Sequence, residues 1–288
     1  MEDKLFGLEI KTPAPLQEIV EGYLYLLVPW GWESIEPENE DGNATFKLLF
    51  TDPIQAENVH LTLKKQFSSI QITPYMLKNK NWLENWKKFF TPIPINNTFI
   101  ILPSWENQKT KQHPDLIPIL IHPEMAFGTG HHATTYLCLK LIANLKHTLI
   151  TQNCFFLDLG TGSGILGLGC ALLGLRGQGI DIDPQAINNA TYNRSLNQIS
   201  PEQFNILLTS IEKIKQKFSL IIANILADPL IQMAQEIKKH LLLQGHLILS
   251  GILKEQAPQV ITIYTKLGLK LIKELTLQEW SALYFRHE

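Results

Sequence analysis

The chain has 288 residues, 45% of them hydrophobic, and a formal net charge of −2 at pH 7. This length allows two domains with a sizeable buried core. The near-neutral charge and the scarcity of arginine give no basic stripe with arginine forks, so direct recognition of RNA or DNA is disfavoured.

The cysteines and the apolar runs indicate the cellular compartment of the protein. Cys138, Cys154 and Cys170 never form a C-x-x-C pair, which fits neither a disulfide framework nor a zinc site. We expect them to be small buried residues in a reducing compartment. The N-terminus lacks a basic segment followed by an apolar core, and no apolar run approaches the ~20 residues of a membrane helix. We therefore expect a soluble, cytoplasmic protein without a membrane partner.

Residues 1–77 alternate strand and helix signals. Strands are expected over residues 5–10, 32–36, 45–50 and from 70 onward, and helices over residues 16–27 and 54–67. The order β-α-β-β-α-β is the ferredoxin-like pattern. Because this segment contains no cluster of His, Cys or paired acids, we interpret it as a small ferredoxin-like α+β domain that recognises the substrate.

Residues 78–116 are expected to form a connector. Trp82, Trp86, Phe89 and Phe90 follow helical spacing, and packing against a domain face explains them better than stacking on a ligand. A strand is expected over residues 99–102. The polar residues 106–116 predict a loop.

From residue 117 to residue 288, strands and helices alternate as in a doubly wound α/β fold. An apolar run over residues 155–157 leads into a turn that contains Asp158, Gly160, Gly162 and Gly164. Since glycine has no Cβ, such a turn can bend sharply and approach a ligand closely. The next short strand ends in Asp181, and an acid at that place can accept hydrogen bonds from both ribose hydroxyls. This pattern predicts a nucleotide site.

The turn alone does not name the ligand, because residues 162–167 also fit the G-x-G-x-x-G dinucleotide pattern. Two features favour S-adenosylmethionine. The turn begins with Asp158, and a nearby carboxylate suits a sulfonium cation and an amino group better than a pyrophosphate. Residues 218–224 predict a buried strand that ends in Asn224, where such enzymes place the group that meets the methyl acceptor. An ordinary glycine-rich strand–helix turn is the plain alternative.

The C-terminal part favours one topology. A strand is expected over residues 245–251, a helix near 255–267, and two more strands over 269–272 and 281–285. Two consecutive strands at the end predict a closing antiparallel pair, typical of class I methyltransferases and unlike a dinucleotide dehydrogenase. The expected fold is a Rossmann-like class I methyltransferase domain over residues 117–288, preceded by the small ferredoxin-like domain.

These motifs together resemble the bacterial ribosomal protein L11 methyltransferase (PrmA) family, most sharply over residues 81–260. The discriminating segment is residues 125–135, M-A-F-G-T-G-H-H-A-T-T, which general methyltransferases lack. Other matching segments are residues 82–86, 103–105, 158–164, 179–184, 223–226 and 250–253. The resemblance implies an S-adenosylmethionine-dependent enzyme that methylates lysine of ribosomal protein L11, with N-terminal amines as an open second class of acceptor.

The resemblance assigns S-adenosylmethionine contact to four positions, Thr135, Gly160, Asp181 and Asn224. Asn224 is also the candidate catalytic residue. By the same analogy, Phe127 and its flanking glycines form a loop over the methionine part of the cofactor. One departure is His-Pro-Glu at residues 122–124, where the family is nearer Asp-Pro-Gly, so a less flexible loop entry is expected.

Methyl transfer from a sulfonium is an in-line displacement, so the enzyme chiefly positions the acceptor nitrogen and excludes water. Asn224 would orient the amine, and no dedicated base is needed if the proton leaves to water first. His131 and His132 point in different directions and have no third ligand nearby, so no metal is expected. A general-base role for one of them stays open beside a plain polar role.

Other functions also stay open. The chain could methylate another protein lysine, an RNA or a small molecule. It could be a nicotinamide-dependent oxidoreductase, against which the terminal strand pair and Asn224 count, or a non-catalytic binder, against which the intact glycine turn and Asp181 count. Asn197, just after a predicted helix, is expected at the surface, where its replacement would be neutral.

Overall fold

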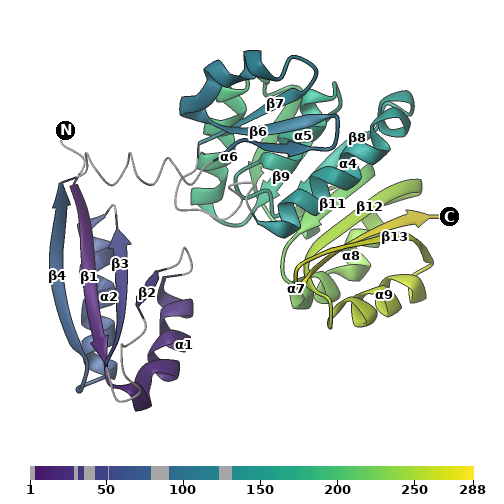
Figure 1. Ribbon diagram of the computed structural model, residues 1–288. Coiled ribbons are helices and arrows are strands. Elements are labelled where there is room, and N and C mark those ends of the chain that lie inside the picture. The colour runs from purple at the N-terminus through teal and green to yellow at the C-terminus, as the bar shows by residue number, and fades with distance from the viewer. Residues whose placement is uncertain (1–3, 29–31, 36–42, 51, 79–90, 123–131) are drawn as a thin grey trace. The chain divides into compact units, whose positions relative to one another are not determined.

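The computed structural model describes residues 4–28, 32–35, 43–50, 52–78, 91–122 and 132–288. The chain divides into two compact units, Met1–Phe89 and Phe90–Glu288 (Figure 1). Among the described helices, none combines the length and hydropathy that crossing a bilayer would require.

The first unit is built on one antiparallel sheet. Its elements in chain order are β1 Lys4–Thr12, α1 Gln17–Leu27, β2 Glu33–Ile35, β3 Ala44–Phe50, α2 Pro53–Gln66 and β4 Gln71–Lys78. The strand order is β2-β3-β1-β4, with every neighbouring pair antiparallel. This order and the β-α-β-β-α-β connection confirm the ferredoxin-like arrangement.

Local sequence explains these elements. In β3 buried and half-buried residues alternate, so Phe46 and Phe50 enter the core on the same face. Helix α2 begins where the Asp52 side chain accepts a hydrogen bond from the Ile54 N–H at 2.9 Å. It buries Ala56, Val59 and Leu63, whose spacing of three and four residues forms one apolar stripe against the sheet.

The second unit contains a seven-stranded sheet of order β10-β9-β8-β11-β12-β14-β13. Its strands are β8 Phe155–Leu159, β9 Arg176–Asp181, β10 Phe204–Leu208, β11 Phe218–Asn224, β12 Leu241–Leu253, β13 Leu269–Leu277 and β14 Trp280–His287. Strands β8 to β12 run parallel, whereas β14 is antiparallel to both of its neighbours. The predicted closing antiparallel pair is confirmed.

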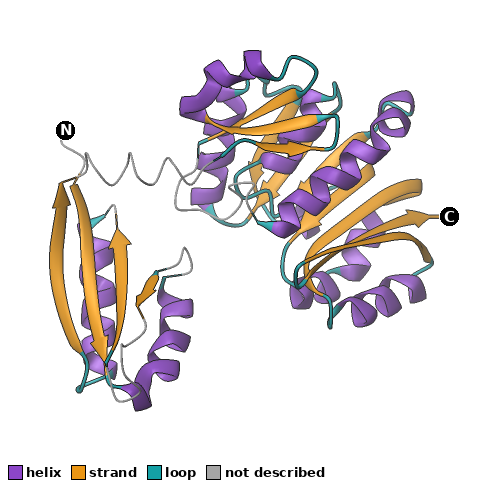
Figure 2. Cartoon of the chain, in the orientation of Figure 1, coloured by secondary structure: helices purple, strands orange, loops and turns teal. Residues whose placement is uncertain are grey.

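Helices cover both faces of this sheet (Figure 2). They are α4 Ala133–Thr151, α5 Ile165–Leu172, α6 Pro184–Leu196, α7 Ala227–Gln232, α8 Ala234–His240 and α9 Ala257–Lys266. Phe156 and Ile222 pack into the core that α4 and α5 cover, and Leu157 and Ile221 pack into the core under α7, α8 and α9. The alternation along the strands thus divides the apolar residues between two cores.

Residues 90–116 differ from the expected connector. They belong to the second unit and carry β5 Ile93–Ile95, β6 Phe99–Pro103 and a 3₁₀ helix over Ser104–Gln112. With β7 Ile117–Ile121 they form a three-stranded sheet that packs on α4, α5 and α6. The loop expected over residues 106–116 was wrong up to Gln112, because a short 3₁₀ helix has no apolar period to reveal it. Trp82, Trp86, Phe89 and Phe90 lie outside the described residues.

Candidate active site

The carboxyl ends of three central strands stand in register. Leu159, the last residue of β8, pairs with Ile180 of β9 and with Ala223 of β11. The next residues, Gly160, Asp181 and Asn224, therefore emerge side by side at one edge of the sheet. The strand order reverses at β8, since β9 lies on one side and β11 on the other. Open α/β sheets bind ligands at the carboxyl ends of the strands at such a switch point.

The turn between β8 and α5 requires its glycines. Gly160, Gly162 and Gly164 have φ angles of +69°, +53° and +82°, which side chains rarely tolerate. A Cβ on Gly160 would also lie 2.6 Å from Cγ2 of Ile225, in the loop after β11. The turn is therefore packed against the loop that follows Asn224.

Asp158 acts inside this turn. Its Oδ2 accepts hydrogen bonds from the Thr161 hydroxyl at 2.8 Å and from the Gly167 N–H at 2.9 Å. The side chain is only 1% exposed, and burial raises the pKa of its carboxyl to about 7, while these two hydrogen bonds oppose the rise. The acid that favoured S-adenosylmethionine in the sequence thus binds the first turn of α5 to the end of β8.

The main-chain N–H groups of the turn are used within the protein. Those of Gly160 and Thr161 both donate to the Ile180 carbonyl, and that of Gly164 donates to the Thr161 carbonyl. The Gly162 N–H donates to Oδ2 of Asp181 at 3.0 Å. A dinucleotide pyrophosphate is held by such N–H groups at a helix N-terminus. Because these four are engaged, the turn suits an uncharged or cationic ligand better than a pyrophosphate.

Asp181 stands beside the turn and is partly exposed. Its Oδ2 accepts from Gly162 and its Oδ1 accepts from the Asp183 N–H at 3.1 Å. Each carboxylate oxygen can accept a second hydrogen bond, so donors such as ribose hydroxyls still fit. Asp183 instead caps α6, since its Oδ1 accepts from the Gln185 N–H at 2.8 Å.

Asn224 and Thr135 come together from distant parts of the chain. The Asn224 Nδ2 donates to the Thr135 hydroxyl at 3.4 Å, although 89 residues separate them. Thr135 is buried in the first turn of α4, whose N-cap is His132. The four predicted site residues are thus brought to the same edge of the sheet, around the switch point.

Gly251, which had no predicted role, packs against Ile225, the residue that follows Asn224. Gly251 of β12 has a φ of +82°, and a Cβ there would lie 2.3 Å from the Ile225 carbonyl oxygen. The preceding Ser250 pairs in register with Asn224, and its hydroxyl donates to the Ser281 carbonyl at 2.9 Å. A glycine inside a predicted strand was the available signal for such a close approach.

His132 has a structural task. Its Nδ1 lies 2.7 Å from the Thr134 hydroxyl and accepts from the Thr134 N–H, which caps α4. Its ring meets Trp280 edge to face, with centroids 4.8 Å apart. Burial lowers the pKa of His132, and the charge of Glu279 opposes this. His131 and Phe127 lie outside the described residues, and the described part of the chain holds no cluster of three or more potential metal ligands.

The expectation for Asn197 was wrong. Its Oδ1 accepts from the Leu120 N–H at 2.9 Å, and its Nδ2 donates to the Leu120 carbonyl at 2.7 Å. The amide therefore pairs with β7 as a neighbouring strand would. A helix-terminal asparagine has the same sequence context in either role, so its partner on β7 could not be foreseen.

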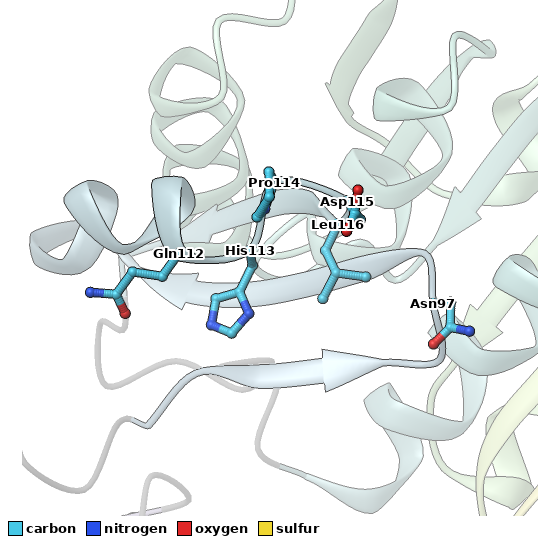
Figure 3. Close-up of a pocket in the computed structure, with 6 residues that line it drawn as sticks. All are labelled: Asn97, Gln112, His113, Pro114, Asp115 and Leu116. Atoms are coloured by element: carbon cyan, nitrogen blue, oxygen red, sulfur yellow. The ribbon is translucent and has the colours of Figure 1, made fainter.

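A pocket lies apart from these residues, on the three-stranded sheet. It is lined by Asn97, Gln112, His113, Pro114, Asp115 and Leu116 (Figure 3). These residues come from the β5–β6 turn and from the segment that enters β7. None of them is among the residues predicted to bind the cofactor.

Comparison with known proteins identifies the family. The model of the ribosomal protein L11 methyltransferase (PrmA) family matches residues 32–288. The ribosomal protein L11 methyltransferase of Desulforapulum autotrophicum is 39% identical over 217 residues, 75% of this chain and 70% of that protein. The enzyme of the same name from Pelobacter propionicus is 34% identical over 253 residues, 86% of this chain and 79% of that protein.

A solved structure agrees with these matches. The crystal structure of the ribosomal protein L11 methylase from Lactobacillus delbrueckii subsp. bulgaricus has a TM-score of 0.62 to this chain, with 27% sequence identity. The alignment covers 69% of this chain and 100% of that chain. The class I sheet order, the site at its switch point and these matches lead to one assignment. The chain belongs to the ribosomal protein L11 methyltransferase (PrmA) family.

Proposed function

We propose that this protein transfers the methyl group of S-adenosylmethionine to amino groups of ribosomal protein L11. The observation that carries the proposal is the emergence of Gly160, Asp181 and Asn224 from three strands in register. This arrangement places a turn for close backbone approach, an acceptor for hydroxyls and an amide together at the carboxyl edge of the sheet. Membership of the family supplies the substrate.

The cosubstrate supplies a methyl group already activated by a positive sulfonium. Asp181 would accept hydrogen bonds from the ribose, and the Cβ-free turn at Gly160 would let the backbone approach the ligand. Thr135 and Asn224, which contact each other, would line the side nearer the acceptor. The engaged N–H groups of the turn support this ligand over a dinucleotide.

The acceptor amine must be neutral to attack. A lysine of pKa ~10.4 needs about 4–5 kcal/mol to lose its proton at pH 7, at about 1.4 kcal/mol per pKa unit. Exclusion of water and a neighbouring positive charge would both lower that pKa. His132 is engaged in the helix cap, so we assign the proton to water. Asn224 then orients the lone pair through an oxygen acceptor, and lysine is the principal acceptor, with N-terminal amines second.

We assign substrate recognition to the ferredoxin-like unit, with its functional boundary at residue 77, and the chemistry to the second unit. The described residues of the first unit contain no group of three or more His, Cys, Asp or Glu side chains that could hold a metal ion. A truncated protein that begins at Phe90 should still bind S-adenosylmethionine but lose most methylation of ribosomal protein L11. Full activity of the truncated protein would refute the assignment. We place the reaction in the cytoplasm, where the ribosomal substrate is assembled.

The decisive experiment uses methyl-labelled S-adenosylmethionine. The protein is incubated with a mixture of ribosomal proteins and ribosomal RNA, and each component is then separated and counted. Label in ribosomal protein L11, mapped by mass spectrometry to amino groups, supports the proposal. Label confined to RNA or to another protein overturns it. The Asp181→Ala variant is the negative control.

A further inference from the structure

Helix α6 and its C-cap carry a row of three asparagines at four-residue spacing, Asn189, Asn193 and Asn197. This spacing places them along one face of the helix. Asn189 and Asn193 are 3% and 0% exposed. Buried side-chain amides need hydrogen-bond partners. The partners of these asparagines therefore show which segments of the chain this helix face holds in place.

Asn193 holds two separate backbone segments. Its Nδ2 donates to the Ser163 carbonyl at 2.9 Å and to Oδ1 of Asn189 at 3.0 Å. Its Oδ1 accepts from the N–H of His122, the first residue after β7, at 2.9 Å. The side chain thereby links the glycine turn to the end of β7, a strand that packs on α6.

The hydrogen bond from Asn193 to Ser163 lies in the middle of the glycine turn. Ser163 stands between Gly162, whose N–H donates to Asp181, and Gly164, whose φ is +82°. A Cβ on Gly164 would lie 3.3 Å from Cα of Ala190, so α6 already passes close to this peptide. The Ser163 carbonyl shares a peptide plane with the Gly164 N–H, which donates to the Thr161 carbonyl at 2.7 Å, and that carbonyl shares a peptide plane with the Gly162 N–H. Rotation of the Ser163–Gly164 peptide would break the bond to Thr161 and so release the peptide whose N–H donates to the Asp181 carboxylate.

We propose that Asn193 is a positioning residue for S-adenosylmethionine. It fixes the Ser163 peptide and so the relation of the glycine turn to Asp181, while remaining buried behind the turn. This inference rests on the proposed function, because it assigns Asn193 to the same cosubstrate site. It adds a residue that acts through Ser163 and Gly162 and has no contact of its own with the ligand.

The chain offers a matched control on the same helix face. Asn197 also binds β7, through the N–H and carbonyl of Leu120, and donates to the Asn193 carbonyl at 2.8 Å. None of these bonds involves the glycine turn. Asn193→Asp retains an acceptor for His122 and loses the donor to Ser163, whereas Asn197→Ala weakens the docking of β7 and leaves the donor to Ser163 in place.

The test measures S-adenosylmethionine affinity by calorimetry and the steady-state kinetics of ribosomal protein L11 methylation. Asn193→Asp should raise the Kd and the KM for S-adenosylmethionine about ten-fold or more, the effect of one buried hydrogen bond. Its kcat at saturating cosubstrate should stay within about three-fold of the wild type, since Asn224 is untouched. Asn197→Ala should change the Kd by less than about three-fold, although urea unfolding should show that this variant is less stable than the wild type. Asn193→Ala also removes the donor to Ser163 but introduces no buried charge. The Kd for S-adenosylmethionine should rise by a similar factor in Asn193→Ala and in Asn193→Asp.

Two results would overturn the inference. One is an unchanged Kd in the Asn193 variants while the wild type binds S-adenosylmethionine, which leaves the proposed function intact. The other is an equal loss of affinity in Asn197→Ala, which would make the effect one of general helix docking. A wild-type protein that does not bind S-adenosylmethionine would overturn both the inference and the proposed function.

Discussion

The buried carboxyl of Asp158 gives a prediction that needs no ligand. Asp158→Asn replaces the acid with a neutral amide of the same shape, and its side-chain oxygen can still accept from Thr161 and Gly167. In the wild type, burial raises the pKa of this carboxyl from 3.8 to about 7. The folded protein therefore holds the proton more tightly than the unfolded chain does between these two values.

The sign and the size of the effect follow from that difference. Because the folded state loses the proton only near pH 7, the contribution of Asp158 to stability falls as the pH rises from about 4 to 7. About two pKa units of this interval lie above pH 5. At about 1.4 kcal/mol per unit, Asp158→Asn should gain roughly 2 to 3 kcal/mol relative to wild type between pH 5 and pH 8. Asp158 is almost fully buried, so solvent screens little of this.

Urea unfolding of both proteins without ligand, at several pH values from 5 to 8, measures the difference. The two units can unfold separately, so the transition to follow is the one whose midpoint moves when S-adenosylmethionine is added. The difference in unfolding free energy between variant and wild type at each pH cancels the contributions of the other titrating groups, which are the same in both proteins. A difference in unfolding free energy that stays constant to within about 0.5 kcal/mol over this range would refute the assignment of a raised pKa to Asp158.

Three further predictions concern the site and its support. Asp181→Ala should weaken S-adenosylmethionine binding by roughly 1.5–3 kcal/mol in calorimetry, the effect of losing a charged acceptor, and tight NADH binding by the wild type would contradict the site. Asn224→Ala should lower kcat about 10²-fold in single-turnover methylation with much less effect on affinity, while Asn188→Ala, at an exposed position of α6, serves as the neutral control. His246 is buried, and this burial, together with the charge of Arg286, lowers its pKa to about 4. The folded protein therefore favours neutral His246, and the stability that this gives is fully present above pH 6.5 and is lost as the pH falls toward 4. Relative to His246→Gln, the wild type should lose about 2 kcal/mol of unfolding free energy from pH 8 to pH 5, and a parallel pH dependence of the two proteins would count against the lowered pKa.

Apolar periodicity predicted most of the fold. The alternation in β3 and the buried run of β11 each follow from which face meets a core, and every expected strand of the first unit is present. The register of β8, β9 and β11 then brings Gly160, Asp181 and Asn224 together. For a parallel sheet with short connections, strand-end positions in the sequence already predict neighbours at the carboxyl edge.

The features that could not be predicted from the sequence depend on long-range contacts, either single hydrogen bonds or packing between distant segments. Asn197 and Asn193 are ordinary helix residues in the sequence, and only the fold shows that they bind Leu120 and Ser163. The strand expected over residues 99–102 is present as β6, but β5 has only three residues and the 3₁₀ helix between β6 and β7 has a polar composition, so residues 90–116 resembled a connector. Their place was set by packing against α4 and α5, a long-range contact that local propensity does not encode.

The two carboxylates at this edge show why glycine spacing alone does not identify the ligand. Residues 162–167 fit a dinucleotide pattern, yet Asp158 takes the Gly167 N–H and Asp181 takes the Gly162 N–H. Each acid thereby removes from the turn a donor that a pyrophosphate would need, and Asp181 adds a negative charge beside it. A ligand that presents hydroxyls and a cation does not need these N–H donors, so the bonds from Gly162 and Gly167 to the two acids do not weaken its binding. Selection between the two ligand classes in this turn therefore rests on which acceptors the protein itself supplies to the glycine N–H groups.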